Sequence, residues 1–320
     1  MNPPYTVSHK ILALTSLISE KIGEIKSARL IKYPLDLRKR NQIKTIQSSL
    51  EIEGNSLTVE QITDLINHKR VLGKKKDITE VKNALKVYSM TDTLDVYKLD
   101  SLCKAHEVLM TGLVDEPGKL RTTSVGIARG DNITHVAPPG KLVPSLMNEL
   151  FDYLRKEKDL ALIKSCVFHY ELEFIHPFVD GNGRIGRLWQ SMILKEYSPI
   201  FEFLPIETLI KERQQDYYGV LASSDKQGNS TGFIEFMLEI IDLTLEDLLF
   251  EQNLTPTNRE RMDVFRSIIG ERHFSRKDYL RHNKDISTAT ASRDLKMAVD
   301  RGILKKTGEK RLTKYYFRIS

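Results

Sequence analysis

The chain of 320 residues has only two cysteines and one tryptophan, and it lacks any long run of uncharged apolar residues. Two cysteines, Cys103 and Cys166, are too few for a disulfide framework or a tetrahedral zinc site, so we expect reduced thiols in helices. Residues 1–10 lack an apolar stretch after a basic start, and no later segment is apolar enough to span a bilayer. The sequence therefore predicts a cytoplasmic protein with no membrane partner.

The chain does contain enough apolar residues to bury a sizeable core, since 40% of its residues are hydrophobic. Its net charge of +6 is unevenly distributed. Residues 256–320 contain 17 Lys plus Arg against 8 Asp plus Glu, a net charge of +9, which leaves 32 against 35 elsewhere. Before them, residues 251–259 are polar and contain Pro256, as is typical of a linker. We expect an N-terminal helical region at 1–95, a central core at 96–250 and a basic C-terminal domain.

The most informative segment is HPFVDGNGRIGR, residues 176–187. His176 precedes a proline, which favours extended backbone and predicts a loop position. Asp180 offers a hard oxygen of the kind that holds magnesium on a nucleotide. The next three residues let main-chain amides turn toward an anion: Gly181, Asn182 and Gly183. The segment thus combines a base, a metal ligand and an anion-binding loop.

A buried helix is predicted directly after this loop, because residues 184–197 carry apolar side chains at helical spacing. Arg184 and Arg187 lie in its first turn, where the helix dipole disfavours each cation by about 0.3–1 kcal/mol. Amides at the same helix end attract phosphate, and two arginines three residues apart can clamp its outer oxygens. A polyphosphate ligand would resolve this conflict. Taken singly, these residues would also fit a loop histidine, a helix cap and surface charges.

The same stretch contains GNGRIG, residues 181–186, which satisfies the G-x-G-x-x-G pattern of dinucleotide-binding folds. That pattern is meaningful only after a buried strand. Here it follows residues 161–174, whose apolar side chains step by four and predict a helix. We therefore reject a dinucleotide-binding fold.

HPFVDGNGRIGR resembles the signature of the Fic family, His-Pro-Phe-x-Asp/Glu-Gly-Asn-Gly-Arg-x-x-Arg, and matches every fixed position. The resemblance implies an all-helical core and magnesium-dependent transfer of AMP from ATP to a hydroxyl group of a protein. It implies that His176 is the general base and that Asp180 binds magnesium. The remaining motif residues would hold the phosphates: Gly181, Asn182, Gly183, Arg184 and Arg187. Glycine at position 183, where the Doc branch usually has lysine, favours AMP transfer over phosphate transfer.

A control element is indicated near the N-terminus. Residues 39–53 are predicted to form a helix that ends at Gly54, which can adopt the left-handed conformation. Glu53 falls in the last turn, where the dipole disfavours a carboxylate, so it needs a partner. The stretch from Ser49 to Gly54 resembles the Fic inhibitory motif Ser/Thr-x-x-x-Glu-Gly/Asn, although an ordinary helix end would also match it. The resemblance implies that Glu53 pairs with Arg187 and blocks productive seating of the γ-phosphate.

Two short β-type runs within residues 121–140 flank turn residues at 130–132 and predict a hairpin. By resemblance it is the flap that aligns a target segment by main-chain pairing, while an exposed hairpin without a role is the alternative. By the same resemblance it lines the nucleotide site with Val125, Gly126, Ile127 and Ala128. In Fic proteins a tyrosine downstream helps to hold the adenosine. Tyr217 is the candidate here, although paired tyrosines also serve packing, and Asp225 stands where many relatives have asparagine.

The basic C-terminal domain, residues 256–320, is predicted to contain helices at 258–270, 275–281 and 287–301, followed by two β-type runs around Gly308. This order resembles a winged helix-turn-helix. Its basic residues would suit DNA phosphates: Arg293, Lys296, Lys305, Lys306, Lys310 and Arg311. Winged helices also dock proteins, so a DNA partner and a protein partner both stay open.

The sequence thus predicts a mainly α protein with a Fic-type helical core, a small β-hairpin and a C-terminal α+β winged helix. The first hypothesis is an autoinhibited protein adenylyltransferase that uses ATP and Mg²⁺ and modifies an unidentified target protein or itself. The alternative is a DNA-binding transcriptional regulator whose Fic core senses nucleotide or only modifies itself. The sequence leaves open the target, the formation of a homo-oligomer, and whether Glu53 acts within its own chain.

Overall fold

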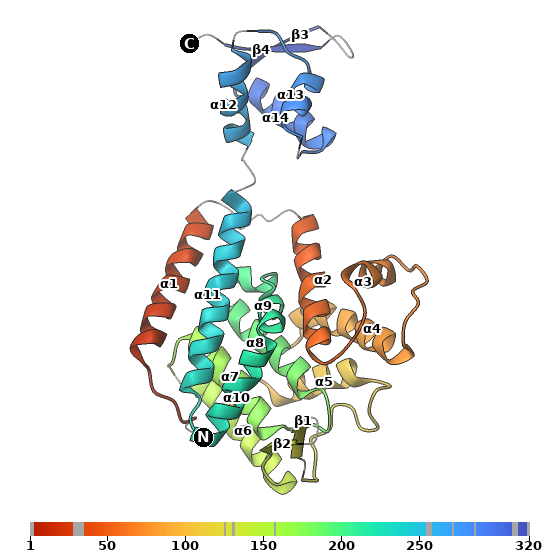
Figure 1. The fold of residues 1–320 in the computed structure, drawn as a ribbon, viewed down its shortest axis with the longest axis vertical. Helices are drawn as coiled ribbons and strands as arrows, with labels where there is room; N and C mark the ends of the chain where they lie inside the picture. The colour runs from red at the N-terminus through yellow and green to blue at the C-terminus, as the bar shows by residue number, and fades with distance from the viewer. Residues whose placement is uncertain are drawn as a thin grey trace. The chain divides into compact units, whose positions relative to one another are not determined.

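The computed structural model describes residues 3–27, 35–124, 126–129, 132–156, 158–253, 258–270, 272–284, 286–308 and 313–318. The chain divides into two compact units, Met1–Asp247 and Leu248–Ser320. The described residues are mostly helical, with two small antiparallel sheets (Figure 1). The predicted mainly α fold class is therefore confirmed.

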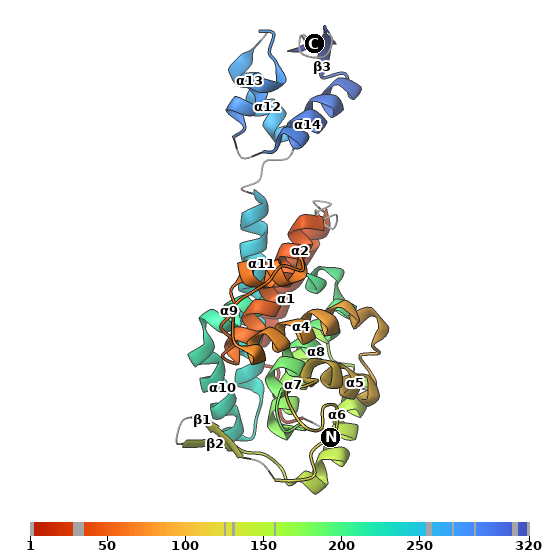
Figure 2. The same ribbon diagram turned by 90° about the vertical axis from the view of Figure 1, so that its right-hand side faces the viewer.

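The first unit is a helical body with one β-hairpin (Figures 1 and 2). Its first half contains α1 (His9–Ser27), α2 (Leu35–Ile52), α3 (Val59–Ile66), α4 (Lys75–Ser89), η1 (Thr91–Thr93) and α5 (Leu99–Met110). Its second half contains β1 (Gly126–Arg129), β2 (Asn132–Val136), η2 (Gly140–Leu142), α6 (Val143–Lys156), α7 (Ala161–Ile175), α8 (Asn182–Tyr197), η3 (Pro199–Glu202), α9 (Ile206–Glu212), α10 (Gln214–Gln227) and α11 (Thr231–Asn253). Helix α1 lies alongside α11 in both views, joined by the ion pair of Lys10 with Glu239.

Helices α7 and α8 form the centre of this unit. Helix α7 buries side chains on nearly all sides, as expected for a helix enclosed by neighbours. Phe168 of α7 and Trp189 of α8 both make edge contacts with Phe151 of α6. The indole N–H of Trp189 donates to the carbonyl of Val96. The loop at 176–181 therefore connects two firmly packed helices, and the helix predicted at 161–174 is confirmed.

Helix α2 packs against α9 and also contacts α8. Lys211 of α9 pairs with Glu51 at 2.8 Å. The helix stops at Ile52, and Gly54 adopts the left-handed conformation with φ 88°, as predicted for the helix end. Glu53 is thereby presented at the C-terminal end of α2.

The predicted hairpin is present as β1 paired antiparallel with β2. Gly126 pairs with Val136 and Arg129 with Asn132, and the register shifts between Ile127 and Ala128. Strand β2 lies near α10. Val125 lies outside the described residues, and of Gly126, Ile127 and Ala128 only the main chain is described.

After the last residues of α11, the described part of the second unit consists of three helices and a second antiparallel pair of strands. Its elements are α12 (Asn258–Ile269), α13 (Arg276–His282), α14 (Thr288–Asp300), β3 (Leu304–Thr307) and β4 (Lys314–Phe317). Phe274, between α12 and α13, forms an isolated bridge with Tyr315 of β4. Asp294 accepts from the Tyr279 hydroxyl at 3.1 Å and pairs with Arg261 at 2.8 Å, so it ties the three helices together. The order of helices and strands predicted for this region is confirmed.

Two boundaries differ from the sequence-based expectation. The linker predicted at 251–259 is too long, because α11 continues to Asn253 and α12 begins at Asn258; residues 254–257 lie outside the described residues. The boundary expected near residue 95 does not coincide with a division between compact units, since α2 packs against α8 and α9, and α4 packs against α5. Among the described helices, none has the length and apolarity that crossing a bilayer requires.

Candidate functional site

The loop at 176–181 begins with a strained residue. His176 caps α7 with φ 49°, and its N–H donates to Leu172 O at 2.9 Å. A left-handed conformation costs a non-glycine residue about 1–2 kcal/mol, so it persists only where the surroundings enforce it. Among the described non-glycine residues, only His68 shares a positive φ. The backbone at His176 is therefore held by its neighbours.

The other end of the loop forms the start of α8. Gly181 precedes the helix with φ 85°, and a Cβ there would lie 2.7 Å from Met110 Sδ. The side chain of Asn182 is bonded at both ends to the main chain of Phe178, accepting its N–H and donating to its carbonyl at 2.9 Å. Amides in the first turn of a helix lack helical partners and attract anions. The loop is thus closed on itself, with a helix N-terminus at its floor.

His106 of α5 supports this loop from behind. Its Nδ1 accepts the N–H of Gly118 at 2.9 Å, so Nε2 carries the proton and donates to Asp180 O at 2.8 Å. The ring stacks on Phe178 with centroids 3.6 Å apart. Burial lowers the pKa of His106 to about 4, which keeps it neutral. Sequence analysis missed this residue because no local pattern marks a contact across more than seventy positions.

Asp180 and Arg184 form a charged pair beside the loop. Asp180 Oδ1 accepts the N–H of Gly181 at 2.6 Å and lies 3.0 Å from Arg184 Nη2. Arg184 is buried, and its Nη1 pairs with Glu80 of α4 at 2.9 Å. The first-turn charge of Arg184 is therefore compensated by carboxylates, not by an outward-facing anion site. In this arrangement Arg184 is not among the residues that line the pocket.

The residues around Asp180 suit a magnesium ion that arrives on a nucleotide. The Asp180 side chain is half exposed, and one of its oxygens is already engaged. No cluster of three or more His, Cys, Asp or Glu side chains able to hold a metal occurs among the described residues. Magnesium on nucleotides usually has one or two carboxylate ligands, with phosphates and waters completing the shell. A single half-exposed carboxylate fits that donor set.

Arg187 is buried beneath the end of α2. Its Nε donates to Ser49 Oγ at 3.1 Å, and its Nη2 donates to Ser49 O at 2.9 Å and to Glu53 Oε1 at 2.8 Å. Burial alone would lower the pKa of Arg187, but the charge of Glu53, aided by Tyr217 and Glu173, raises it above its ordinary value. Glu53, about a third exposed at 32%, and Arg187, 1% exposed, thus neutralise each other. This is the pairing that the resemblance implied.

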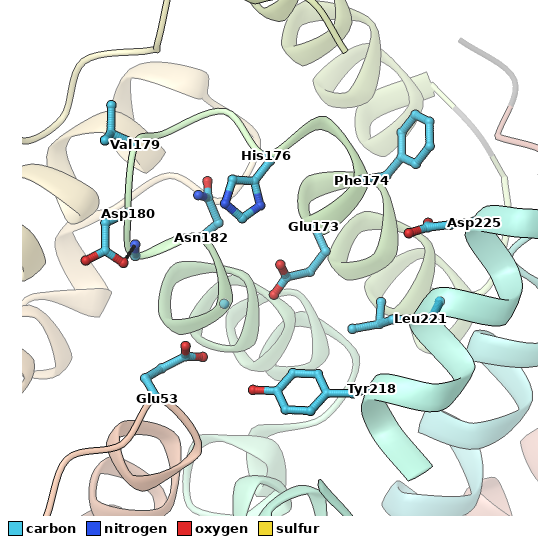
Figure 3. A pocket seen from close by; sticks show the side chains of 13 residues that line it. Glu53, Glu173, Phe174, His176, Val179, Asp180, Asn182, Tyr218, Leu221 and Asp225 are labelled. Atoms are coloured by element: carbon cyan, nitrogen blue, oxygen red, sulfur yellow. Dashed lines mark hydrogen bonds between the residues drawn. The ribbon is translucent and has the colours of Figure 1, made fainter. Parts of the chain in front are cut away.

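A pocket opens between the end of α2, the loop and α10 (Figure 3). Glu53, Glu173 of α7 and Tyr218 of α10 converge on it in the close view. A Cβ on Gly183 would lie 2.5 Å from Glu53 Oε1, so only glycine allows this approach of the carboxylate. The complete lining is Glu53, Glu173, Phe174, His176, Val179, Asp180, Gly181, Asn182, Gly183, Tyr218, Leu221, Ala222 and Asp225.

The structure corrects the assignment of Tyr217. That side chain is fully buried, its hydroxyl lies within hydrogen-bond distance of His169 Nε2 at 3.0 Å, and it does not line the pocket. Tyr218 lines it instead, with its hydroxyl 3.4 Å from Ile52 O. Asp225 also lines the pocket and accepts from the Tyr170 hydroxyl at 2.9 Å. Adjacent residues of a helix point about 100° apart, and the sequence alone did not determine whether Tyr217 or Tyr218 faces the pocket.

The buried side chain of His169, which contacts Gln190 and Tyr217, gives the protein a testable dependence of stability on pH. Burial, and to a lesser extent the charge of Arg187, lowers its pKa to about 3, below the value of about 6.5 in the unfolded chain. His169 is therefore protonated below about pH 6.5 in the unfolded chain but stays neutral in the folded protein. The free energy of unfolding consequently decreases as the pH drops below about 6.5. Between pH 7 and pH 5 the wild type should lose about 2 kcal/mol more than His169→Gln. Urea unfolding followed by the fluorescence of Trp189 measures this difference.

The matched control for this prediction is His9→Gln, which alters an exposed histidine. It should keep the wild-type pH dependence. Burial raises the pKa values of Glu171 and Glu207 to about 7, which favours the folded state as the pH falls. Both carboxyls are present in all three proteins, so only differences between the proteins are informative. Equal pH dependence in the wild type and His169→Gln would contradict the prediction.

Comparison with known proteins places this geometry in a family. The Fic/DOC family model matches residues 96–194. A crystal structure of a Fic family protein from Desulfovibrio desulfuricans is 39% identical, covers 99% of this chain and 98% of that chain, and superposes with a TM-score of 0.76. The chain is 28% identical over 270 residues to a protein adenylyltransferase Fic from Nematostella vectensis, across 79% of this chain and 60% of the relative.

A second curated relative is a probable protein adenylyltransferase from Aquifex aeolicus, 27% identical over 213 residues, 59% of this chain and 65% of that protein. The chain thus spans less than two thirds of the length of these two curated relatives. The solved structure, by contrast, matches over almost the whole of both chains. With the motif at 176–187 placed between α7 and α8, these similarities show that the chain belongs to the Fic family.

Proposed function

We propose that this protein transfers AMP from ATP to a hydroxyl group of a protein. One observation carries the proposal: the glycine-rich start of α8 and His176 line a single pocket, and Glu53, which lines the same pocket, pairs with the buried Arg187. Such a floor suits phosphate groups, and a histidine suits the removal of a proton from an alcohol. The names of the Nematostella and Aquifex relatives support the same activity.

In the proposed reaction, the oxygen of the target hydroxyl attacks the α-phosphorus of ATP. The new P–O bond joins AMP to the target, the bond to the β-phosphate breaks, and pyrophosphate leaves. The proton of the hydroxyl passes to His176. The amides at the start of α8 would bind the phosphates, and Arg187 would hold the terminal phosphate once Glu53 has moved away. Asp180 would bind magnesium, which neutralises phosphate charge when present.

Inhibition by Glu53 is part of the same proposal. The carboxylate of Glu53 bonds to Arg187 at 2.8 Å and approaches the position of Gly183 within the pocket. A phosphate and a carboxylate cannot both take the same guanidinium edge, since the two anions would repel each other. Release of the end of α2 from Arg187 would therefore be the step that admits ATP in a productive position.

For the second unit we propose a winged-helix docking module. The order α12, bridge at Phe274, α13, α14, β3 and β4 agrees with that fold. Basic side chains are exposed on α14 and β3, namely Arg293, Lys296, Lys305 and Lys306. Lys310 and Arg311 lie outside the described residues. Contacts to DNA phosphates would make binding fall steeply with salt, whereas a protein partner would be less sensitive.

The expected result for the proposed activity is protein labelling by α-labelled ATP with magnesium and no labelling by γ-labelled ATP. The AMP moiety carries the α-phosphate, while both outer phosphates leave as pyrophosphate. Denaturing gels of the full chain, alone and with added cell extract, provide the measurement. Label from γ-labelled ATP would instead reveal phosphate transfer.

The alternative of a nucleotide-sensing DNA regulator predicts another pattern. Neither form of ATP would then label protein, even in a variant without the Glu53 carboxylate. Tight, salt-dependent binding of duplex DNA would support that alternative. The proposed activity would be wrong under that outcome.

A further inference from the structure

Arg121, in the loop between α5 and β1, is a buried cation that binds main-chain carbonyls. Its side chain is 3% exposed, and burial lowers its pKa. It makes these bonds: Nε to His176 O at 2.6 Å, Nη1 to Thr123 O at 2.6 Å, Nη2 to Pro138 O at 2.7 Å and to Ile175 O at 3.0 Å. Its own N–H donates to Pro177 O at 2.9 Å. One residue thus joins five main-chain positions.

Two of these carbonyls belong to the stems of the β1–β2 hairpin. Thr123 stands three residues before the first residue of β1, and Pro138 two residues after the last residue of β2. The Arg121 guanidinium therefore binds the main chain on both sides of the hairpin, once before β1 and once after β2.

The other carbonyls belong to the end of α7 and the strained residue that follows it. Helix α7 has no basic residue in its own last turn, and a cation is favoured beside the last carbonyls of a helix. Arg121 supplies that cation from a distant loop. It also bonds to the carbonyl of His176, whose φ of 49° requires support from outside the helix.

Gly140 keeps the two stems close together from the opposite side. A Cβ on Gly140 would lie 2.1 Å from the carbonyl oxygen of Thr122, so no other residue fits without moving the chain. The segment that follows β2 is thus packed directly against the segment that precedes β1, next to Arg121. This gives a second position at which the same arrangement can be disturbed.

We propose that Arg121 is a positioning residue that couples the hairpin to His176. By bonding to both stems and to the histidine backbone, it fixes the distance between a target segment aligned on the hairpin and the imidazole that receives its proton. The inference rests on the proposed function. An arginine that only stabilised the fold would affect stability without separating the rate of transfer from the affinity for ATP.

The test uses the full chain carrying Glu53→Ala, with Arg121→Lys or Gly140→Ala added. Lysine keeps the charge but cannot bridge four carbonyls. Each variant should lower the labelling rate at saturating α-labelled ATP by about 10-fold, because the reacting groups lose their alignment. The ATP concentration for half-maximal rate should change less than the labelling rate does, since the phosphate-binding elements on α8 are untouched.

Hydrogen exchange provides a measurement that does not depend on catalysis. In both variants the amides of β1 and β2 and of His176 should exchange at least about 10-fold faster, while those within α8 keep their rates. The control is Arg155→Lys, which alters an exposed arginine bonded to Tyr97 O. It should leave labelling and exchange unchanged.

The outcomes separate the two proposals. If the Glu53→Ala parent labels no protein, the proposed function is wrong. Hydrogen exchange alone then tests the coupling between the hairpin and His176. Folded Arg121→Lys and Gly140→Ala proteins with unchanged exchange in the hairpin and at His176 would overturn the coupling. Unchanged labelling rates in both variants, with an active parent, would overturn it as well.

Discussion

Glu53→Ala should raise the initial rate of AMP labelling by about 10- to 100-fold, the factor expected when a charged hydrogen bond of about 1.5–3 kcal/mol no longer opposes substrate binding. Arg187 would keep its bonds to the hydroxyl and carbonyl of Ser49, so the guanidinium stays in place without its carboxylate partner. A terminal phosphate can then take the position that Glu53 vacates. The measurement is incorporation of α-labelled ATP in the presence of magnesium.

Glu51→Ala is the matched control for this prediction. Glu51 also lies near the end of α2 and pairs with a cation at 2.8 Å, but that cation is Lys211, outside the pocket. Its loss should change the rate by less than about 2-fold, as is typical of exposed ion pairs. If both substitutions activate equally, loosening of α2 is the cause and the Glu53 carboxylate has no specific role. A folded Glu53→Ala protein with the wild-type rate would contradict inhibition by this pair.

The sequence was informative where the functional residues are consecutive. The segment at 176–187 forms the loop and the first turn of α8, so its spacing along the chain is also its spacing in the site. The end of α2 was predictable for a related reason, because Gly54 terminates the helix and leaves the carboxylate of Glu53 without a local partner. Periodicity in turn predicted the buried helices on either side of the loop.

The remainder of the site depends on contacts between distant segments. Arg184 lies 104 positions from its partner Glu80, and no pattern in the chain indicates that α4 supplies a carboxylate. The phosphate contact expected for Arg184 therefore remains a prediction, and its observed partners are carboxylates. Arg121 is harder still to recognise, because carbonyl groups occur at every residue and leave no pattern in the sequence. Arg121 can be recognised only in the structure, where its loop packs against the end of α7.

His176→Asn in the Glu53→Ala background should lower the labelling rate by about a thousand-fold, within the range for losing a general acid–base group. Asparagine tolerates the left-handed conformation that this position requires, so the loop keeps its backbone, whereas alanine would add strain. The side chain would remain polar but would have no nitrogen able to take a proton. Labelling with α-labelled ATP gives the rate, and calorimetry should show ATP affinity within about 3-fold of the parent, since the phosphate-binding amides stay in place.

His68→Asn is the matched control, because His68 also has a positive φ, of 57°, yet is exposed and lies outside the pocket. It makes the same chemical change on the same kind of backbone, so an effect of the substitution on left-handed geometry would appear in both proteins. Its labelling rate should equal that of the parent. If His176→Asn transfers AMP as fast as the His68 variant, proton removal belongs to another group, and the bordering carboxylate of Glu173 becomes the next candidate base.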